Sequence, residues 1–516
     1  MLALYRVDGT PDSADGYPRP SWVSFSAGRA VFDRGLAEYV DARNQFMVME
    51  RSLCMVDRSA LVRGARIGGV GLLGLLALQL VFFGLLVAAA AVPDAPIVRH
   101  LVTDIRHKDY GPASLPDRMG TQSDSYTECV VVGTGLGRPG LSPLERAGIM
   151  PRLASCNNGG PTQLLELDGG QKISTGPYFR YWAGYTVLTR PVLALTTMAG
   201  LRIVVGGLLL SAFAALFVAV GTTSGRLAAA ALVAPVVLGS NLMSTPVSSF
   251  SQALSIAAYV GGAAGIAVAA RRSLRWGLAA TAVAAAVFCY VDLLTTPPAA
   301  WALSVAVLTA VVWGRTRDLR STLRGFLLSG LVWPVSFTIT WVSRWVIAVP
   351  FVGAHEVVTG VANQVLFRTE GQYAGVSDAL WAPVAKNWEY WMGNVPTARA
   401  VLIGVLIVAV VGALASLRRG WRALVAGGIV AAAALVVPFW YETLRNHSQI
   451  HAFFTYRSIT IALGVIGFAW LATARGPRHD TMVAAGSPTL ATPAESPSSG
   501  VDVATDARAT SAPHVG

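Results

Sequence analysis

Two histidines lie four residues apart in a short polar segment near the C-terminal end of the chain. His447 and His451 share one face if this segment is helical, and Asn446 precedes them. That spacing suits a metal ion or a pair of hydrogen-bond donors for a phosphate group. No Glu follows the first histidine as in the HExxH motif of zinc proteases, so that motif is excluded.

The same segment continues with Tyr456 and Arg457. An aromatic belt at a membrane interface is the simpler interpretation of such a segment. Belts rarely carry so many hydrogen-bonding groups, however. We therefore favour a functional site, with His447 as a catalytic residue and His451, Tyr456 and Arg457 as substrate or phosphate ligands.

A long polar segment, residues 93–190, carries the acidic residues best suited to acid–base chemistry. We assign Asp124 and Glu128 as catalytic, because a carboxylate beside an acceptor hydroxyl can act as a general base. Asp104 and Asp109 compete with them for this role. Two facing carboxylates can also hold Mg²⁺ or Mn²⁺, but oxygen ligands do not select between these ions. The metal stays unassigned.

One aromatic run in this segment is suited to an anionic sugar substrate. The run is Tyr178-Phe-Arg-Tyr-Trp-Ala-Gly-Tyr185. Arg180 can pair with phosphate oxygens in a planar geometry. Tyr181, Trp182 and Tyr185 offer aromatic faces to a sugar ring.

Two further charged residues lie where a membrane makes charge costly. Asp292 ends one apolar run, and Arg344 lies well inside another. Such residues need a partner. We expect Arg344 to bind an anion or to pair with Asp292, against the alternative that its side chain extends to the interface.

The composition is that of a membrane protein. Of the 516 residues, 53% are hydrophobic and 13% are charged, against about 25% charged residues in soluble domains. Several apolar runs exceed the roughly 18 residues that cross a bilayer, and their composition favours helices over barrel strands. We predict an all-α integral membrane fold with about ten transmembrane helices, near residues 67–92, 200–221, 226–243, 252–270, 276–292, 299–314, 325–350, 399–417, 422–439 and 458–474.

The basic residues predict the topology. The net charge of +12 is spread over helix ends and forms no single basic stripe with aromatic residues, so no nucleic-acid partner is expected. Because cytoplasmic links carry the excess of Lys and Arg, both termini should be cytoplasmic. The expected organisation is a cytoplasmic segment 1–66, a membrane domain 67–475 with extracytoplasmic loops 93–190 and 351–398, and a disordered cytoplasmic tail 476–516.

Cysteine usage adds one expectation. Of the four cysteines, only Cys129 and Cys156 lie in one hydrophilic segment. If that segment faces an oxidising compartment, the two can form a disulfide.

The polar runs resemble those of an uncharacterised family of bacterial polytopic membrane proteins. The matching stretches keep the family's order and spacing, and they are Tyr178–Tyr185, Asp292–Pro297, Trp341–Trp345, Gln364–Arg368 and Asn446–Arg457. The segment Asp124–Glu128 looks like the family's acidic pair, with Glu in place of the second Asp. Ala183 stands where the family has His, so that position has no acid–base role in this chain.

The wider architecture is similar to the C superfamily of membrane glycosyltransferases (GT-C). This resemblance implies a polyprenyl-phosphate sugar as donor and an acidic residue in the first extracytoplasmic loop. The expected protein is a glycosyltransferase of the inner (plasma) membrane that acts on a glycan acceptor of the cell envelope, with membrane lipid as its other partner. A surface-polysaccharide polymerase or ligase, a transporter of lipid-linked saccharides and a noncatalytic assembly protein remain alternatives.

Overall fold

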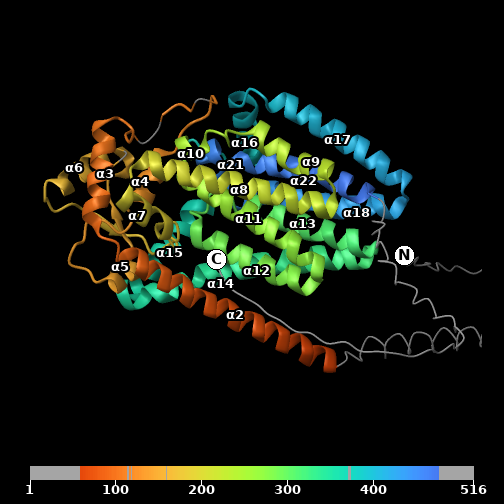
Figure 1. Cartoon of the computed structure of the whole chain (residues 1–516), viewed down its shortest axis with the longest axis horizontal. Coiled ribbons are helices and arrows are strands. Elements are labelled where there is room, and N and C mark those ends of the chain that lie inside the picture. Colours follow the sequence, from red (N-terminus) through yellow and green to blue (C-terminus); the bar gives the residue numbers. More distant parts are fainter. Residues whose placement is uncertain (1–57, 113–114, 118, 159, 370–373, 476–516) are drawn as a thin grey trace, which may run out of the picture.

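The computed structural model describes residues 58–112, 115–117, 119–158, 160–369 and 374–475. Within these ranges nine helices are long and apolar enough to cross a membrane. They lie side by side along the long axis of the molecule (Figure 1). The all-α membrane fold is thereby confirmed. The spans are formed by α2 (Arg58–Ala90), α8 (Met198–Ser224), α11 (Phe250–Arg272), α12 (Leu274–Val291), α13 (Pro297–Thr316), α14 (Leu319–Val352), α17 (Ala398–Arg418), α18 to α19 (Trp421–Ala431 and Val436–Thr443, joined by η2, Ala432–Leu435), and α21 with α22 (Ala452–Thr455 and Arg457–Ala474).

The structure differs from the sequence prediction at the segment 226–243. This segment forms α9 (Arg226–Gly239), which has 14 residues and is about 21 Å long at 1.5 Å per residue. That is shorter than the roughly 30 Å hydrocarbon core. The helix stops because the backbone is extended at Ser240 and the following Asn241 bonds to Tyr456 instead of continuing the helix. A short helix, α10 (Thr245–Ser248), follows.

The segment between α2 and α8 folds into a small unit at one end of the bundle (Figure 1). It contains an antiparallel pair of short strands, which the all-α prediction did not include. A disulfide joins Cys129 to Cys156 and links α4 to η1. The elements of the unit are α3 (Asp94–Arg106), α4 (Ser125–Gly133), α5 (Pro143–Ile149), β1 (Pro151–Leu153), η1 (Cys156–Asn158), α6 (Pro161–Asp168), β2 (Thr175–Pro177) and α7 (Thr186–Leu195).

Buried ionic contacts attach this unit to the end of α2. Arg190 donates to the carbonyl oxygens of Ala89 at 2.9 Å and Val92 at 2.7 Å. Ala89 lies in the last turn of α2, where its carbonyl oxygen also accepts from the Val92 N–H at 3.2 Å, and Val92 follows two residues after the helix ends. Asp94 Oδ1 accepts from both Arg190 Nη2 and Arg146 Nη1 at 2.6 Å. One carboxylate thus connects α3, α5 and α7 to the bundle.

Three more helices cover the same end of the bundle. They are α15 (Ala354–Thr369), α16 (Ala382–Asn394) and α20 (Arg445–Ile450). α15 and α16 both pack against α20, and α15 also packs against α14. The segments expected to form two separate loops, 93–190 and 351–398, therefore gather over one end, together with the polar segment between α19 and α22.

Arginines gather at the opposite end of the bundle. Arg315 donates to the carbonyl oxygen of Ala270 at 3.1 Å. Arg317 lies close enough to Arg419 and Arg475 for their charges to lower its pKa, after the larger effect of burial. The predicted cytoplasmic segment up to residue 57 and the predicted tail 476–516 lie outside the described residues.

The contacts of Asp94 lead to a test of stability. Asp94→Asn leaves two guanidinium groups, only 4% and 10% exposed, without their carboxylate, and should cost about 3 kcal/mol. The apparent melting temperature of the purified protein in detergent measures this loss. Asp168→Asn is the matched control, because its ion pair with Arg106 is exposed and should contribute less than about 1 kcal/mol. Equal melting temperatures for the two variants would contradict the anchoring role of Asp94.

Candidate functional site

A cavity of about 530 Å³ lies under the elements that gather at this end of the bundle. We call it the polar cavity. Its walls come from the segment before α4, from β1 and the run after β2, from the turn after α12, and from α15 and α20. Five residues assigned from the sequence line it, namely Asp124, Arg180, Tyr181, His447 and His451.

Asp124 is the one carboxylate among the described residues that line the polar cavity. It is the N-cap of α4, since its side chain accepts from the backbone N–H of Thr127 at 3.0 Å. The other oxygen, Oδ2, accepts from Gln252 Nε2 at 2.6 Å. Burial raises the pKa of Asp124 against the opposing effect of these hydrogen bonds. A carboxylate with a raised pKa is a better proton acceptor once it is ionised.

Arg457 and Tyr456 do not line the polar cavity. They lie on the protein side of Asp124 and support it through hydrogen bonds. Arg457 donates to Gln252 Oε1, so the amide of Gln252 connects the guanidinium to Asp124. Arg457 Nε and the Tyr456 hydroxyl both donate to Asn241 Oδ1, at 2.8 and 2.9 Å. These residues, which were expected to contact substrate, instead fix the position of the carboxylate that does line the cavity.

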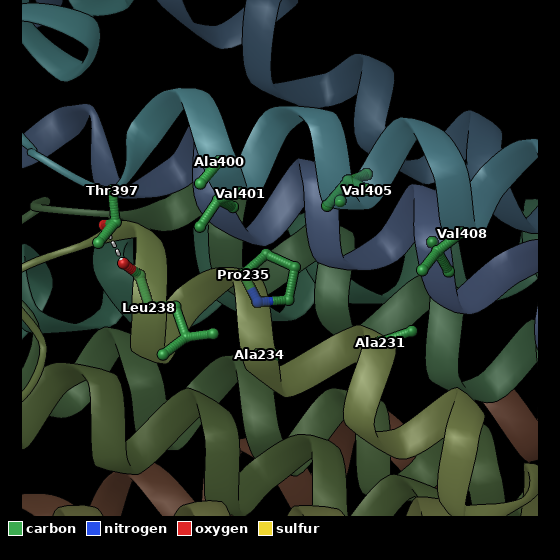
Figure 2. A pocket seen from close by; sticks show the side chains of 11 residues that line it. Ala231, Ala234, Pro235, Leu238, Thr397, Ala400, Val401, Val405 and Val408 are labelled. Atoms are coloured by element: carbon green, nitrogen blue, oxygen red, sulfur yellow. Dashed lines mark hydrogen bonds between the residues drawn. The ribbon is translucent and has the colours of Figure 1, made fainter.

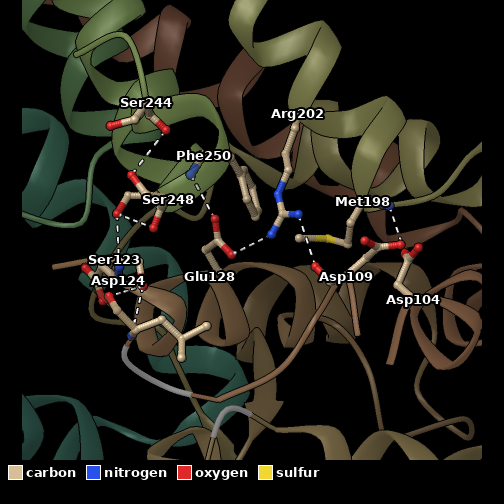
Figure 3. Close-up of polar contacts among 12 residues, drawn as sticks. Asp104, Asp109, Ser123, Asp124, Glu128, Met198, Arg202, Ser244, Ser248 and Phe250 are labelled. Atoms are coloured by element: carbon tan, nitrogen blue, oxygen red, sulfur yellow. Dashed lines mark hydrogen bonds and ion pairs between the residues drawn. The ribbon is translucent and has the colours of Figure 1, made fainter. Parts of the chain in front are cut away.

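Glu128, the second predicted catalytic acid, lies outside the polar cavity. Figure 3 shows its side chain directed toward Phe250 and Arg202. Its Oε1 accepts from the Phe250 N–H at 3.0 Å, and its Oε2 lies 3.5 Å from Arg202 Nη2. The carboxylate therefore joins α4 to the start of α11 and to α8. Burial raises the pKa of Glu128 to about 7, although Arg202 opposes the shift.

The competing acids, Asp104 and Asp109, also lie away from the cavity. Asp104 is buried and accepts from the backbone N–H of Met198 at 2.8 Å, which ties α3 to α8 (Figure 3). Asp109 is exposed. The geometry therefore leaves Asp124 as the candidate base.

Three arginines line the polar cavity: Arg152, Arg180 and Arg368. Among the described residues none of them forms an ion pair with an acidic side chain. Arg180 Nε is buried and has no hydrogen-bond partner within this part of the chain. Unpaired guanidinium groups of this kind make the cavity a receptor for an anion.

The sequence assignment included Arg180 but neither Arg152 nor Arg368. Arg368 ends the Gln364–Arg368 run, which is one of the stretches that carry the family resemblance. That run could have indicated Arg368 as a site residue. Arg152 follows Pro151 in β1 and has no distinctive sequence context. Only the folding of β1 against β2 brings it to the cavity.

His447 uses both ring nitrogens within the protein. Its Nε2 lies 3.0 Å from the carbonyl oxygen of Leu294, which can only accept, so Nε2 carries the proton. Its Nδ1 accepts from Arg368 Nη1 at 2.9 Å, and Arg368 Nη2 donates to the Tyr181 hydroxyl. Burial, followed by the charge of Arg368, lowers the pKa of His447 well below its usual value. This neutral imidazole orients Arg368 and has no free nitrogen for the predicted catalytic role.

His451 keeps a nitrogen unpaired. Its ring stacks on Phe454 with centroids 5.0 Å apart, and within the described part of the chain its Nδ1 is buried without a partner. Burial lowers the pKa of His451 to about 4, with a smaller effect from Arg368. A neutral imidazole here is available to bond a hydroxyl group of a ligand.

Four other predicted ligands support the cavity from outside. Arg344 donates to the carbonyl oxygens of Tyr181 at 3.1 Å and Gly148 at 2.9 Å. It is fully buried and bonds to backbone, so it neither extends to the interface nor pairs with Asp292. Asp292 accepts from the Thr295 N–H at 2.8 Å and shapes the turn that lines the cavity. Trp182 donates to Thr340 and Tyr185 contacts Thr134, both inside the protein.

A second cavity is apolar and carries no titratable group. It has a volume of about 350 Å³ and lies between α9, α17 and α22. Figure 2 shows Pro235 and Leu238 of α9 facing Val401 and Val405 of α17. The hydroxyl of Thr397 donates to Leu238. This cavity can accommodate hydrocarbon but cannot perform acid–base chemistry.

Among the described residues no three His, Cys, Asp or Glu side chains are grouped so that they could hold a metal ion.

No family model, no curated protein and no solved structure matches the chain. The fold defines the class as a multi-pass α-helical membrane protein.

The position of His447 leads to a second prediction. His447→Leu removes the acceptor for Arg368 and the donor for Leu294, and should lower the stability of the purified protein by about 2 kcal/mol. His447→Gln offers one acceptor and one donor and should lose less than about half of that. The melting temperatures in detergent compare the two variants. Equal losses of stability in the two variants would show that the imidazole contributes by packing and not by its hydrogen bonds.

The pKa of Glu128 predicts how stability changes with pH. Because the folded pKa of about 7 is above the usual 4.5, this group favours the folded state below about pH 4.5, and the contribution is lost as pH rises through about 7. The loss is on the order of 3 kcal/mol. Between about pH 5 and pH 8, the melting temperature of the natural protein should fall more than that of Glu128→Gln. Parallel curves for the two proteins would contradict this assignment.

Proposed function

We propose that this protein is an integral membrane glycosyltransferase that transfers a sugar from a lipid-linked, polyprenyl-phosphate donor to an acceptor of the cell envelope. One observation carries the proposal. A single cavity beside the membrane-spanning helices combines three guanidinium groups, unpaired with acids among the described residues, with one buried carboxylate, Asp124.

We place the lipid part of the donor beside α14. A smaller cavity shares Arg180, Tyr181, Gln364 and Arg368 with the polar cavity, and its remaining walls are Trp341, Trp345, Val361 and Val365 of α14 and α15. Both tryptophans donate their indole N–H to the Arg180 carbonyl oxygen, at 2.8 and 3.3 Å. Since α14 is a membrane-spanning candidate, a lipid chain can lie along its surface while the phosphate reaches the arginines.

In the proposed reaction, the carboxylate of Asp124 acts on the acceptor and the arginines act on the leaving phosphate. Asp124 accepts the proton of the acceptor hydroxyl while the acceptor oxygen bonds to the anomeric carbon of the sugar. The bond between that carbon and the phosphate oxygen breaks, and the oxygen keeps the electron pair. Arg180 and Arg368 stabilise the negative charge on the departing lipid phosphate. The ring of Phe453 offers a face for the sugar.

The proposed topology follows from the two ends of the bundle. The arginine-rich end, with Arg315, Arg317, Arg419 and Arg475, corresponds to the cytoplasm by the positive-inside rule. The polar cavity then faces the extracytoplasmic side of the inner membrane. The disulfide between Cys129 and Cys156 fits an oxidising compartment on that side. Both termini would be cytoplasmic.

Asp124→Asn tests the proposed base. This variant keeps the size of the side chain but removes the proton acceptor, and should lower the transfer rate by about a hundredfold or more. In cells that lack the natural gene, it should fail to restore the envelope glycan, and the lipid-linked donor should accumulate. Mass spectrometry of extracted lipid-linked saccharides measures the accumulation.

Asp109→Asn is the control for that experiment, because Asp109 is an exposed acid of the same segment. It should restore the glycan fully. Membrane levels of both variants are compared by immunoblot. If Asp124→Asn restores the glycan as well as Asp109→Asn does, the proposed function is wrong.

A further inference from the structure

Two tyrosine rings organise the three arginines of the polar cavity. The rings of Tyr178 and Tyr181 are neighbours, with centroids 5.4 Å apart. Arg152 lies 5.1 Å and Arg180 lies 5.4 Å from the centroid of Tyr178. Arg368 lies 6.0 Å from the centroid of Tyr181. The guanidinium groups therefore flank one pair of adjacent rings.

The charges around these rings do not balance. The cavity lining contains three guanidinium groups and one carboxylate, Asp124. His447 and His451 add no charge, since both are neutral. The arginines are only partly exposed, and partly buried charge without a counter-ion is costly. Counted over the lining residues, a ligand with two negative charges would balance the cavity, whereas a ligand with one would leave an excess of positive charge.

We infer that the polar cavity binds a diphosphate group, so that the sugar of the donor is linked to its lipid through two phosphates. This inference rests on the proposed function and narrows its substrate class. A sugar linked to lipid through one phosphate carries one negative charge on the linkage. A diphosphate linkage carries two.

The positions of the arginines assign a side to each phosphate. Arg180 and Arg368 line both the polar cavity and the smaller cavity beside α14, so they lie nearest to the lipid chain. Arg152 lines the polar cavity but not the smaller one. Within the described residues, its guanidinium donates through Nη1 to the Leu153 carbonyl oxygen at 3.2 Å and through no other N–H group. Its other N–H groups are available for the second phosphate, on the sugar side.

With this donor, the reaction is the same except that the leaving group is a lipid diphosphate. The acceptor oxygen bonds to the anomeric carbon, its proton goes to Asp124, and the bond from that carbon to the diphosphate breaks. The electron pair leaves on the lipid diphosphate. Arg152 is next to the oxygen from which the sugar departs, and thus stabilises the charge that develops there.

A matched pair of lipids tests this inference. Farnesyl phosphate and farnesyl diphosphate, each used as its methyl ester, have the same chain and carry one and two negative charges, as the two linkages do. The purified full-length chain in detergent is titrated with each, and the rise in melting temperature gives the affinity. Farnesyl diphosphate should bind at least about tenfold more tightly, which is the effect of one additional charged contact.

Three variants identify the groups responsible. Arg152→Gln should lower the affinity for farnesyl diphosphate by about tenfold and leave the affinity for farnesyl phosphate unchanged. Arg368→Gln should lower the affinity for both lipids. Arg99→Gln, at an exposed position of α3 outside the cavity, is the control and should change neither. Arg152→Lys retains the charge and should keep the preference in part, even if the Gln variant does not purify in folded form.

Two outcomes would overturn the inference. One is equal affinity for both farnesyl lipids. The other is displacement of farnesyl diphosphate by phosphatidylglycerol at equal concentration, which would identify a site for ordinary phospholipid headgroups. If either occurs while Asp124→Asn still blocks sugar transfer, the proposed function stands with a different donor. If Asp124→Asn also restores the glycan, both proposals fail.

Discussion

Buried ionic contacts hold the small unit between α2 and α8 against the end of the helical bundle, and the position of the polar cavity depends on them. Arg190 bonds the last carbonyl groups of α2 and meets Asp94, while Glu128 receives the first N–H group of α11. Two of these contacts join a charged side chain to the end of a membrane-spanning helix. Because Glu128 lies in α4, its bond to α11 helps to fix the position of α4 and of the N-cap residue Asp124.

The hydrogen-bond partners of the arginines at this end of the bundle divide them into two groups. Arg190 and Arg344 bond to backbone carbonyls, and Arg457 bonds to the amides of Asn241 and Gln252. Arg190 is also paired with Asp94, and the other two are surrounded by carbonyl and amide dipoles. Arg180 and Arg368 have no acid of their own within the described residues, so they are available to an anionic ligand. A carboxylate beside either one would remove the capacity to bind phosphate.

Nine of the ten spans predicted from the sequence are formed, and five of the assigned residues line the polar cavity. Long apolar runs with arginines at their ends define most helices without ambiguity, and only α9 ended early, because Asn241 bonds to Tyr456. The polar runs indicated where the site lies, but the contacts of their members could not be read from residue type. Glu128 and Arg344 are as polar as Asp124 and Arg180, yet they point into the protein. Arg152 reached the cavity through strand pairing that no sequence pattern indicated.

Ala183 illustrates why a residue's identity is weak evidence for chemistry. It stands where the resembling family has His, and it is buried outside the cavity lining. Its backbone is left-handed, with φ 58°, a conformation in which His is enriched and Ala is not. The next residue, Gly184, packs so closely on Tyr290 that a side chain there would collide. A His would suit this backbone conformation, and Ala183 contributes no side chain to the polar cavity.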